Sequence, residues 1–212
     1  MKTNLLKITA IALIFIGVGI TSCDKEPNLD LGEVYFKTDK VWVVGNQTWS
    51  DVVMANACKK NTFFGGDWKR DKYCADCCQN PGYGDMFSWR AVNYYKDQLC
   101  PAPWRVPTRQ DFIDLDIALG GTGERRRGLV YDTYLNPDVW GGAFGGRITS
   151  DGELVMEGKD AFYWSHEERR KGRVGGFYLH FNYNRMGFNI EPQGVINKDN
   201  GFMLRCVQCN YD

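Results

Sequence analysis

The clearest hydrophobic pattern in the chain follows Thr108. Apolar residues recur there with the spacing of one helix face, and they are Phe112, Ile113, Leu115, Ile117, Ala118 and Leu119. The Thr108 hydroxyl can cap the first turn, and Asp111 lies three residues later, where a capping partner reaches back. Gly120-Gly121 ends the pattern. We therefore predict a capped helix over residues 109–119.

A second helical face precedes this one. The apolar and aromatic residues that form it are Trp89, Val92, Tyr95 and Leu99. Ser88 stands immediately before them and is a suitable N-cap, because its hydroxyl can accept a backbone hydrogen bond. We therefore predict a helix over residues 88–99.

Elsewhere the pattern predicts short strands separated by glycine-rich loops. Before the helices we predict a hairpin over residues 34–45, with its turn at Thr38-Asp39-Lys40, and a strand over 48–54. Residues 56–67 and 69–85 are predicted as loops. The strands predicted after residue 120 are 140–149, 154–156, 162–165, 176–183, 187–190 and 202–207. Early strands, two helices and a late antiparallel sheet predict the α+β class.

Residues 1–22 have the pattern of an export signal. Two early lysines precede an apolar stretch of 13 residues over 8–20, which is shorter than the roughly 20 residues of a membrane-spanning helix. Ile20-Thr21-Ser22-Cys23 then resembles a bacterial lipobox, in which Cys23 would carry the lipid. Each buried methylene contributes about 0.8 kcal/mol, so several acyl chains would anchor the chain firmly in a membrane.

The polar residues 23–33 are predicted as a lipidated tether, and residues 34–212 as a single domain. Removal of residues 1–22 leaves 190 residues, which suits one hydrophobic core. Asp24 directly follows Cys23 and resembles the surface-export signals of lipoproteins in gut Gram-negative bacteria. We therefore expect a lipid-anchored position at the cell outer membrane, exposed at the surface.

The charges balance, with 26 basic and 26 acidic side chains. This gives no global attraction for nucleic acid, and we expect none as a partner. Two local charge runs, 125–127 and 167–171, are predicted as solvated loops. Besides Cys23 there are seven cysteines, which are Cys58, Cys74, Cys77, Cys78, Cys100, Cys206 and Cys209. Outside the cytoplasm disulfides are expected, and an odd number leaves one cysteine free or paired between chains.

Three motifs in this order of elements resemble the Fibrobacter succinogenes major paralogous domain family of bacterial lipoproteins. The first is Tyr83-Gly84-Asp85-Met86-Phe87-Ser88-Trp89-Arg90-Ala91, which is similar to the family's entry into its first helix. The second is Cys100-Pro101-Ala102-Pro103-Trp104-Arg105-Val106-Pro107-Thr108 with the helix that follows, and the third is Asn200-Gly201-Phe202-Met203-Leu204-Arg205-Cys206-Val207. Tyr163-Trp164-Ser165 is similar to an aromatic-Trp-Ser strand of the family. The resemblance covers about residues 34–208 and implies a C-type-lectin-like fold, with two helices on antiparallel sheets and long loops.

The resemblance also implies a disulfide between Cys100 and Cys206. It would close a loop of about 105 residues and stabilise the fold by about 4–5 kcal/mol in the loop-entropy model. The remaining cysteines go beyond the family pattern, and their pairing stays open. Zinc is disfavoured because the protein is exported, and because a strand holding Cys206 in the core would break the Cys206–Cys209 pair as a second half-site.

Five residues are candidates for ligand contact: Tyr134, Trp140, Tyr183, Arg185 and Glu191. With Phe188, the aromatic members lie in or beside long loops, where an exposed ring next to polar groups suits stacking on a sugar. The same residues are equally compatible with positions in the core.

Glu191-Pro192-Gln193 partly resembles the tripeptide that supplies calcium ligands in calcium-dependent lectins. The downstream half of such a site would be Asn197-Lys198-Asp199-Asn200, which follows closely and has no tryptophan. Calcium prefers hard oxygen ligands, but this spacing is short for two halves of one site. We therefore expect a proline turn here and no metal.

The sequence does not point to an enzyme. Neither His166 nor His180 can be assigned a nucleophile and a paired acid, so surface or hydrogen-bonded histidines are expected. Arg105-Val106-Pro107-Thr108 is similar to a helix start in formylglycine-generating enzymes, but no reactive thiol pair is identifiable, which leaves a shared scaffold only. We expect no catalytic residues and no cofactor. The favoured function is a non-enzymatic envelope binding module for a glycan or a surface protein, and the alternative is a structural or assembly subunit of a surface complex.

Overall fold

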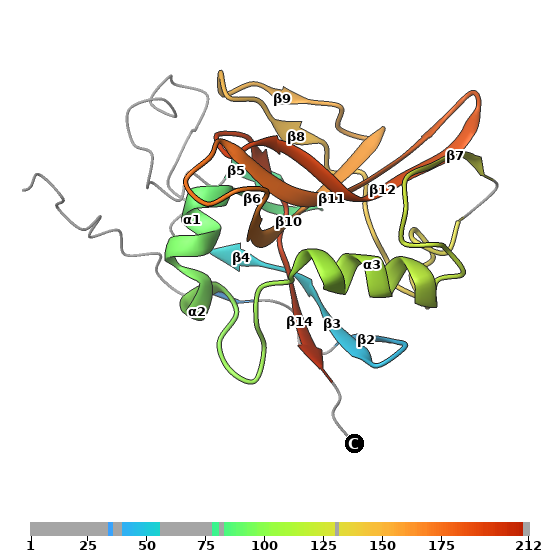
Figure 1. Ribbon diagram of the computed structural model, residues 1–212, viewed down its shortest axis with the longest axis horizontal. Helices are drawn as coiled ribbons and strands as arrows, with labels where there is room; N and C mark the ends of the chain where they lie inside the picture. Colours follow the sequence, from blue (N-terminus) through green and yellow to red (C-terminus); the bar gives the residue numbers. More distant parts are fainter. Residues whose placement is uncertain (1–33, 36–39, 56–77, 81–82, 130–131, 210–212) are drawn as a thin grey trace, which may run out of the picture.

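The computed structural model describes residues 34–35, 40–55, 78–80, 83–129 and 132–209 (Figure 1). This part of the chain forms an α+β fold that is rich in antiparallel sheet, which agrees with the fold class predicted from the order of elements. Its helices are α1 (Trp89–Tyr94), α2 (Lys96–Leu99) and α3 (Arg109–Ala118).

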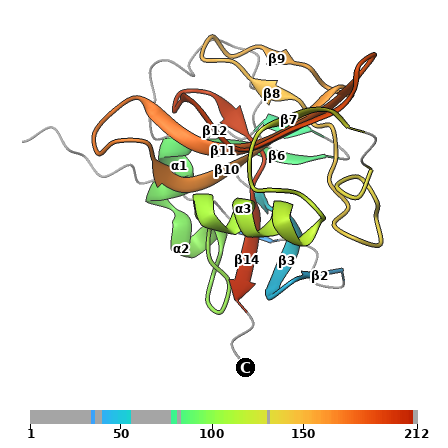
Figure 2. The ribbon, with the colours of Figure 1, turned by 45° about the vertical axis from the view of Figure 1, so that its right-hand side comes forward.

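The largest strands form a four-stranded antiparallel sheet, the central sheet, in the order β10-β11-β12-β7. Its strands are β10 (Asp160–Glu168), β11 (Gly175–Asn184), β12 (Gly187–Asn197) and β7 (Arg126–Leu129). Both 162–165 and 176–183 were predicted as strands, and both lie within longer ones. Figures 1 and 2 show α1 and α3 packed on different sides of this sheet.

Three smaller sheets complete the fold, in the orders β5-β6-β13-β8-β9, β14-β3-β2 and β1-β4. The strands of the first are β5 (Cys78–Asn80), β6 (Gly84–Ser88), β13 (Gly201–Phe202), β8 (Arg147–Ile148) and β9 (Leu154–Val155). Those of the others are β14 (Arg205–Cys209), β3 (Gln47–Val52), β2 (Trp42–Val44), β1 (Val34–Tyr35) and β4 (Met54–Ala55). The predicted strand over 202–207 is therefore two strands, because the chain passes from one sheet to another between β13 and β14.

The core consists of two aromatic-rich clusters on opposite faces of the central sheet. One face packs Trp164 and Tyr178 against Val92 of α1. The other packs Phe181 with Phe112 of α3. Side chains alternate between the two faces along each strand, so both faces of the same strands contribute to the core.

The predicted helix over 109–119 is confirmed in α3. The Thr108 hydroxyl accepts from the Asp111 backbone N–H at 3.0 Å, and the Asp111 carboxylate accepts from the Thr108 N–H at 2.6 Å. The Arg105 guanidinium donates to both Asp111 oxygens, at 2.6 and 2.8 Å. Gly120 follows with a φ of +89°, which suits the end of a helix.

The predicted helix over 88–99 is present as two consecutive helices. The Ser88 hydroxyl accepts from the Ala91 N–H at 3.1 Å, which confirms the predicted cap. The helical geometry breaks at Tyr95, where φ is −100° and ψ is 16°. The break is shallow, because the Leu99 N–H still donates to the Tyr95 carbonyl at 2.8 Å.

The predicted hairpin over 34–45 is wrong. Strand β1 pairs with β4, whereas β2 pairs with β3 across a two-residue turn at Gly45-Asn46. Gly45 has a φ of +58°, which glycine adopts without strain at the first position of such a turn. The Gly45-Asn46 pair is itself a hairpin signal in the sequence.

The predicted strand over 140–149 is also wrong, since only β8 is extended there. Gly141 and Gly146 have φ values of +62° and +71°, which a regular strand does not contain. The carbonyls of Trp140 and Gly141 instead accept from the buried Arg205 guanidinium, at 2.5 and 2.7 Å. The segment therefore turns around a charged side chain. Within the region predicted as loop over 69–85, residues 78–80 form β5, and Gly84 and Asp85 begin β6.

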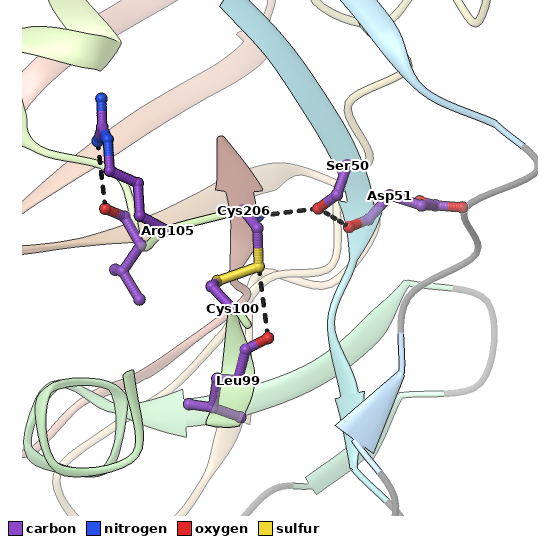
Figure 3. The surroundings of a disulfide bond; sticks show 7 residues. Ser50, Asp51, Leu99, Cys100, Arg105 and Cys206 are labelled. Atoms are coloured by element: carbon purple, nitrogen blue, oxygen red, sulfur yellow. Dashed lines mark hydrogen bonds between the residues drawn. A yellow bond between two sulfur atoms is a disulfide. The ribbon is translucent and has the colours of Figure 1, made fainter. Parts of the chain in front are cut away.

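The disulfide between Cys100 and Cys206 is confirmed (Figure 3). It joins the end of α2 to β14, and both cysteines are buried. The Cys206 N–H donates to the Ser50 hydroxyl at 2.8 Å, and the Cys206 sulfur lies 3.4 Å from the Leu99 carbonyl oxygen. The bond thus ties the helical region to the β14-β3-β2 sheet.

Candidate functional site

One end of the central sheet carries a polar hollow of about 260 Å³, which we name the sheet-face pocket. Its lining residues are Arg125, Arg126, Arg127, His180, Asn182, Asn184, Met186, Asn189, Ile190 and Glu191. They come from β7 and the residue before it, from β11 and β12, and from the turn between β11 and β12. Figure 1 shows this β11–β12 hairpin beside β7, at the end of the sheet away from α1.

Strand register explains why polar side chains gather there. His180, Asn182 and Asn184 alternate along β11 and therefore share one face of the sheet. His180 is paired with Glu191 of β12, and Asn182 is paired with Asn189. Two polar rows thus lie next to each other on the floor of the pocket.

A hydrogen-bond chain holds most of this floor in place. One Asp160 carboxylate oxygen lies 2.7 Å from His180 Nε2 and accepts from Asn182 Nδ2 at 2.9 Å. The side-chain oxygen Oδ1 of Asn182 accepts in turn from Asn189 Nδ2 at 2.7 Å. Burial would raise the pKa of the Asp160 carboxyl, but the hydrogen bonds from His180 and Asn182 outweigh it and hold the pKa below its ordinary value. Asp160 is therefore ionised and holds His180 and Asn182 in place on the floor of the pocket.

An aromatic layer lies next to this network. The His180 imidazole stacks on Phe162 of β10, with ring centroids 4.4 Å apart and an angle of 8° between the planes. Burial, together with the negative charge of Glu191, raises the pKa of Tyr178 to about 12. Tyr178 therefore stays neutral at any physiological pH and marks the border between the polar floor and the apolar core.

The predicted turn at Pro192 is wrong, because Glu191-Pro192-Gln193 lies inside β12. Tyr178 is paired with Gly194, but His180 is paired with Glu191, so β12 has one more residue than β11 between these pairs. This is a β-bulge, a place where a strand tolerates a residue without an N–H. The bulge ends the regular register next to Glu191, at the edge of the pocket.

Strand β7 forms the wall of the pocket and corrects the prediction of a solvated loop over 125–127. Arg126 lines the pocket and also donates to the fully buried Asp116 of α3 at 2.5 Å. Arg125 lies 3.8 Å from the Glu191 carboxylate across the pocket. Arg127 is exposed. The run therefore divides into one half-buried arginine that is paired with Asp116 and two exposed arginines, and all three border the pocket.

Asp116 takes its remaining hydrogen bonds from two other segments. It accepts from the Tyr134 hydroxyl at 2.9 Å and from the Gly123 N–H at 2.7 Å. This carboxylate lies among apolar side chains of α3 and is charge-paired, so it is structural. It fixes the position of β7 against α3.

Three aromatic residues considered for ligand contact belong to the core. Tyr134 and Trp140 are fully buried, and Phe188 is 1% exposed. Tyr134 packs edge-on against Trp140, with ring centroids 5.8 Å apart. Their large rings fill the core cluster between α3 and the central sheet. The interpretation of Tyr134 and Trp140 as ligand contacts is therefore wrong.

Of the other candidates, Tyr183 and Arg185 are exposed and Glu191 is half-buried, and the three do not form one surface. Tyr183 is 64% exposed and alternates with Asn182 and Asn184, which places it on the opposite face from the sheet-face pocket. Arg185 is exposed in the turn between β11 and β12. Only Glu191 of the five lines the pocket.

The structure separates Glu191 from Asn197–Asn200. Residues 191 and 197 lie in the same strand, six positions apart, which corresponds to about 20 Å. The calcium arrangement considered from the sequence is therefore not assembled. Among the described residues, no group of three or more histidine, cysteine, aspartate or glutamate side chains is arranged to hold a metal ion.

The residues that sequence reasoning missed are Asp160, His180, Asn182 and Asn189. The sequence does carry a signal for these residues, because polar side chains occur at every second position on both sides of the Arg185-Met186 turn. His166 is not part of the pocket, and its Nδ1 lies 3.3 Å from the Pro107 carbonyl oxygen.

Several predictions fall on residues that lie outside the described part of the chain. These are the signal and tether over 1–33, with Cys23, the loop over 56–67, the part of the second loop over 69–77, and the cysteines Cys58, Cys74 and Cys77. For Cys78 and Cys209 the structure gives the strands β5 and β14 only. Their pairing stays a prediction.

None of the helices in the described segments is long and apolar enough to cross a bilayer. In comparisons with known proteins, no family model, no curated protein and no solved structure matches the chain.

Proposed function

We propose that this chain is a lipid-anchored, non-enzymatic binding module of the bacterial cell envelope and that its sheet-face pocket binds a glycan. The observation that carries the proposal is the pocket itself. Its hollow of about 260 Å³ is lined by amide, imidazole, carboxylate and guanidinium groups. A volume at or below the roughly 300–1,000 Å³ of sites for drug-sized molecules suits a single sugar ring.

The chemistry of the lining supports a polyhydroxyl ligand. Sugar hydroxyls both donate and accept hydrogen bonds, and the lining offers both kinds of group on fixed side chains. Asn182 and Asn189 are held by their mutual hydrogen bond, and His180 is held by Asp160. A ligand that binds there meets groups already in position, which reduces the entropy lost on binding.

Glu191 and Arg125 are the most adaptable pair in the pocket. Their separation of 3.8 Å is longer than a hydrogen bond, so both charges can turn to a ligand without a strong bond being broken. The Glu191 side chain is 25% exposed and the Arg125 side chain 56%. We expect these two side chains to make the direct charge-assisted contacts.

The proposed fold is C-type-lectin-like, in the Fibrobacter succinogenes major paralogous domain family. Two helical regions on antiparallel sheets support this assignment, as does the Cys100–Cys206 disulfide that the resemblance implies. The motifs over 83–91, 100–108 and 200–207 support it as well. The lipobox at Cys23 supports the anchor at the outer membrane.

A structural or assembly role is the second candidate function. The hairpin between β11 and β12 carries two exposed large apolar side chains, Tyr183 at 64% and Met186 at 79%. Such residues at a projecting tip suit a contact with another surface protein. A partner protein that binds the tip would leave the polar floor of the pocket free.

The test is a glycan-array screen of residues 24–212, with calcium and with a chelator. Every contact in the described structure lies within this stretch. We expect binding that survives chelation. In Glu191→Gln the affinity should fall about 10- to 100-fold, because one hydrogen bond to a charged group is lost. Glu157→Gln is the matched control, because Glu157 is exposed and lies outside the pocket.

Two results would contradict the assignment. Equal binding by Glu191→Gln and Glu157→Gln, with binding lost in Tyr183→Ala, would place the ligand on the opposite face of the hairpin. Absence of any glycan ligand would favour the assembly role. The anchor is tested separately, since Cys23→Ala should release the chain from the membrane fraction and abolish its labelling by a fatty acid.

A further inference from the structure

A second hollow, of about 560 Å³, lies at the other end of the central sheet, and we name it the basic hollow. Its lining residues are Arg169, Arg170, Arg173, Val174, Gly175, Val195, Ile196 and Asn197. They come from the turn between β10 and β11 and from the last residues of β12. Figures 1 and 2 both show this turn at the α1 end of the sheet, away from the β11–β12 hairpin.

The charge of the basic hollow is not balanced by the acidic residues next to it. Glu167 accepts from the Arg109 backbone N–H at 2.5 Å. Glu168 is bonded to Lys198 Nζ and accepts from the Gly172 N–H at 3.0 Å. Both neighbouring carboxylates are therefore committed elsewhere. Within the described part of the chain, no ion pair holds any of the three arginines in the hollow.

The turn that carries these arginines is fixed by backbone hydrogen bonds. The Arg169 N–H donates to the Gly175 carbonyl at 3.0 Å, and the Arg173 N–H donates to the Arg170 carbonyl at 3.0 Å. The Lys198 N–H donates to the Val174 carbonyl at 2.8 Å, which ties the turn to the end of β12. The positive charges are thus held on a defined loop before any ligand arrives.

Apolar side chains accompany the positive charges. Val174 is 68% exposed at the rim, and Val195 is 37% exposed on the neighbouring strand. Gly175 allows this close approach, because a Cβ atom there would stand 2.7 Å from Val195 Cγ1. Cations next to an exposed aliphatic side chain are the combination that suits the boundary between lipid headgroups and acyl chains.

We propose that the basic hollow binds the phosphate-bearing headgroups of an anionic lipid surface. Guanidinium groups match phosphate oxygens in two-point hydrogen bonds, and three of them border one hollow. Val174 then enters the edge of the acyl region. The whole chain has 26 basic and 26 acidic side chains, so this attraction is local rather than a result of net charge.

This site is separate from the glycan pocket. The two hollows lie at opposite ends of β11, whose ten residues span about 33 Å. Occupation of one does not block the other. The inference rests neither on the proposed glycan ligand nor on the lipid at Cys23, because it depends only on the residues of the hollow.

The experiment measures partition of the lipid-free chain, residues 24–212, onto vesicles of phosphatidylglycerol and onto vesicles of phosphatidylcholine. We expect binding to the first, weakened by salt. Arg170→Gln with Arg173→Gln should reduce this binding about thirtyfold, since each arginine near an anionic surface contributes about fivefold. The matched control is Arg127→Gln with Arg185→Gln, which removes the same charge from exposed arginines elsewhere and should bind as the unaltered chain does.

A second pair of variants tests the apolar contact. Val174→Ser should weaken binding to phosphatidylglycerol severalfold, whereas Val43→Ser should not, although Val43 is exposed to the same extent, at 66%. Equal losses in the two arginine pairs would overturn the proposal in favour of general charge attraction. Binding to phosphatidylglycerol vesicles that inorganic phosphate competes away, with no loss in Val174→Ser, would overturn the lipid surface in favour of a soluble phosphate. Lack of binding to phosphatidylglycerol would overturn the proposal outright.

Discussion

Removal of the Cys100–Cys206 disulfide should lower the stability of this protein by a predictable amount. The bond closes a loop with a sequence separation of 106 residues. In the loop-entropy model a loop of this length stabilises the folded state by about 4.7 kcal/mol, because it restricts the unfolded chain. That value is a large fraction of the roughly 5–15 kcal/mol that stabilise a typical domain.

The folded state also loses packing when the sulfur atoms are removed. Cys100 is 3% exposed and Cys206 is fully buried, so alanine at both positions leaves a small cavity between α2 and β14. The two effects have the same sign. We therefore expect Cys100→Ala with Cys206→Ala to lower the free energy of unfolding by about 4–6 kcal/mol.

The assay is urea unfolding of residues 24–212, followed by tryptophan fluorescence in a buffer without reductant. The double variant is preferred to either single one because it leaves no unpaired partner to exchange with other cysteines. A matched control is Ala91→Gly with the disulfide intact, which perturbs the same core cluster without opening the loop. A loss below about 2 kcal/mol in the double variant would refute the loop-entropy argument.

Three further predictions concern charged groups. Hydrogen bonds from Arg105 and Thr108 outweigh the effect of burial and hold the pKa of Asp111 below its ordinary value of 3.8. The ionised Asp111 therefore contributes to the free energy of unfolding above pH 3.8, and this contribution is lost as the pH falls below that value. Urea unfolding should show that Asp111→Asn is less stable than the unaltered chain at neutral pH, by about 1–3 kcal/mol, and that this difference narrows in acid. Asp116→Asn should cost about 3–5 kcal/mol because it leaves Arg126 half-buried without its anion, whereas Asp114→Asn, exposed on the same helix, should change stability by less than about 0.5 kcal/mol. Arg205→Met should lower the melting temperature by about 5–15 °C, because the buried carbonyl of Trp140 and the partly buried carbonyl of Gly141 lose their donor.

Local signals in the sequence were sufficient to predict the helices. Thr108 and Asp111 are three residues apart, and the whole capping arrangement lies within one turn, so its prediction needed no knowledge of the fold. Pairing of the first strands depended on distant residues. Strand β1 pairs with β4 about twenty positions later, and nothing in the sequence of 34–45 indicates that choice.

Buried charges account for the largest errors. Arg126 stands in a run of three arginines, which favours a solvated loop, yet it is paired with an aspartate on an amphipathic helix. The segment that begins at Trp140 was predicted as a strand, but the carbonyls of Trp140 and Gly141 accept from the Arg205 guanidinium and the segment turns there. In both cases one distant polar partner reverses the local preference, and a single sequence does not show which residue that partner is.

The polar character of the sheet-face pocket follows from the lengths of the elements around it. Six residues of α1 cover about 9 Å, whereas β11 spans about 33 Å. Beyond the helix, polar side chains take the place of Trp164 and Tyr178 on this face of the sheet and form the floor of the pocket.

The network on this floor satisfies its own groups. Asp160, His180, Asn182 and Asn189 bond to one another and need no ligand to remain in place. The Glu191–Arg125 pair, separated by 3.8 Å, is the contact that a ligand can improve. Substitution at Asp160 should therefore disturb folding first, whereas substitution at Glu191 should disturb binding and leave the fold intact.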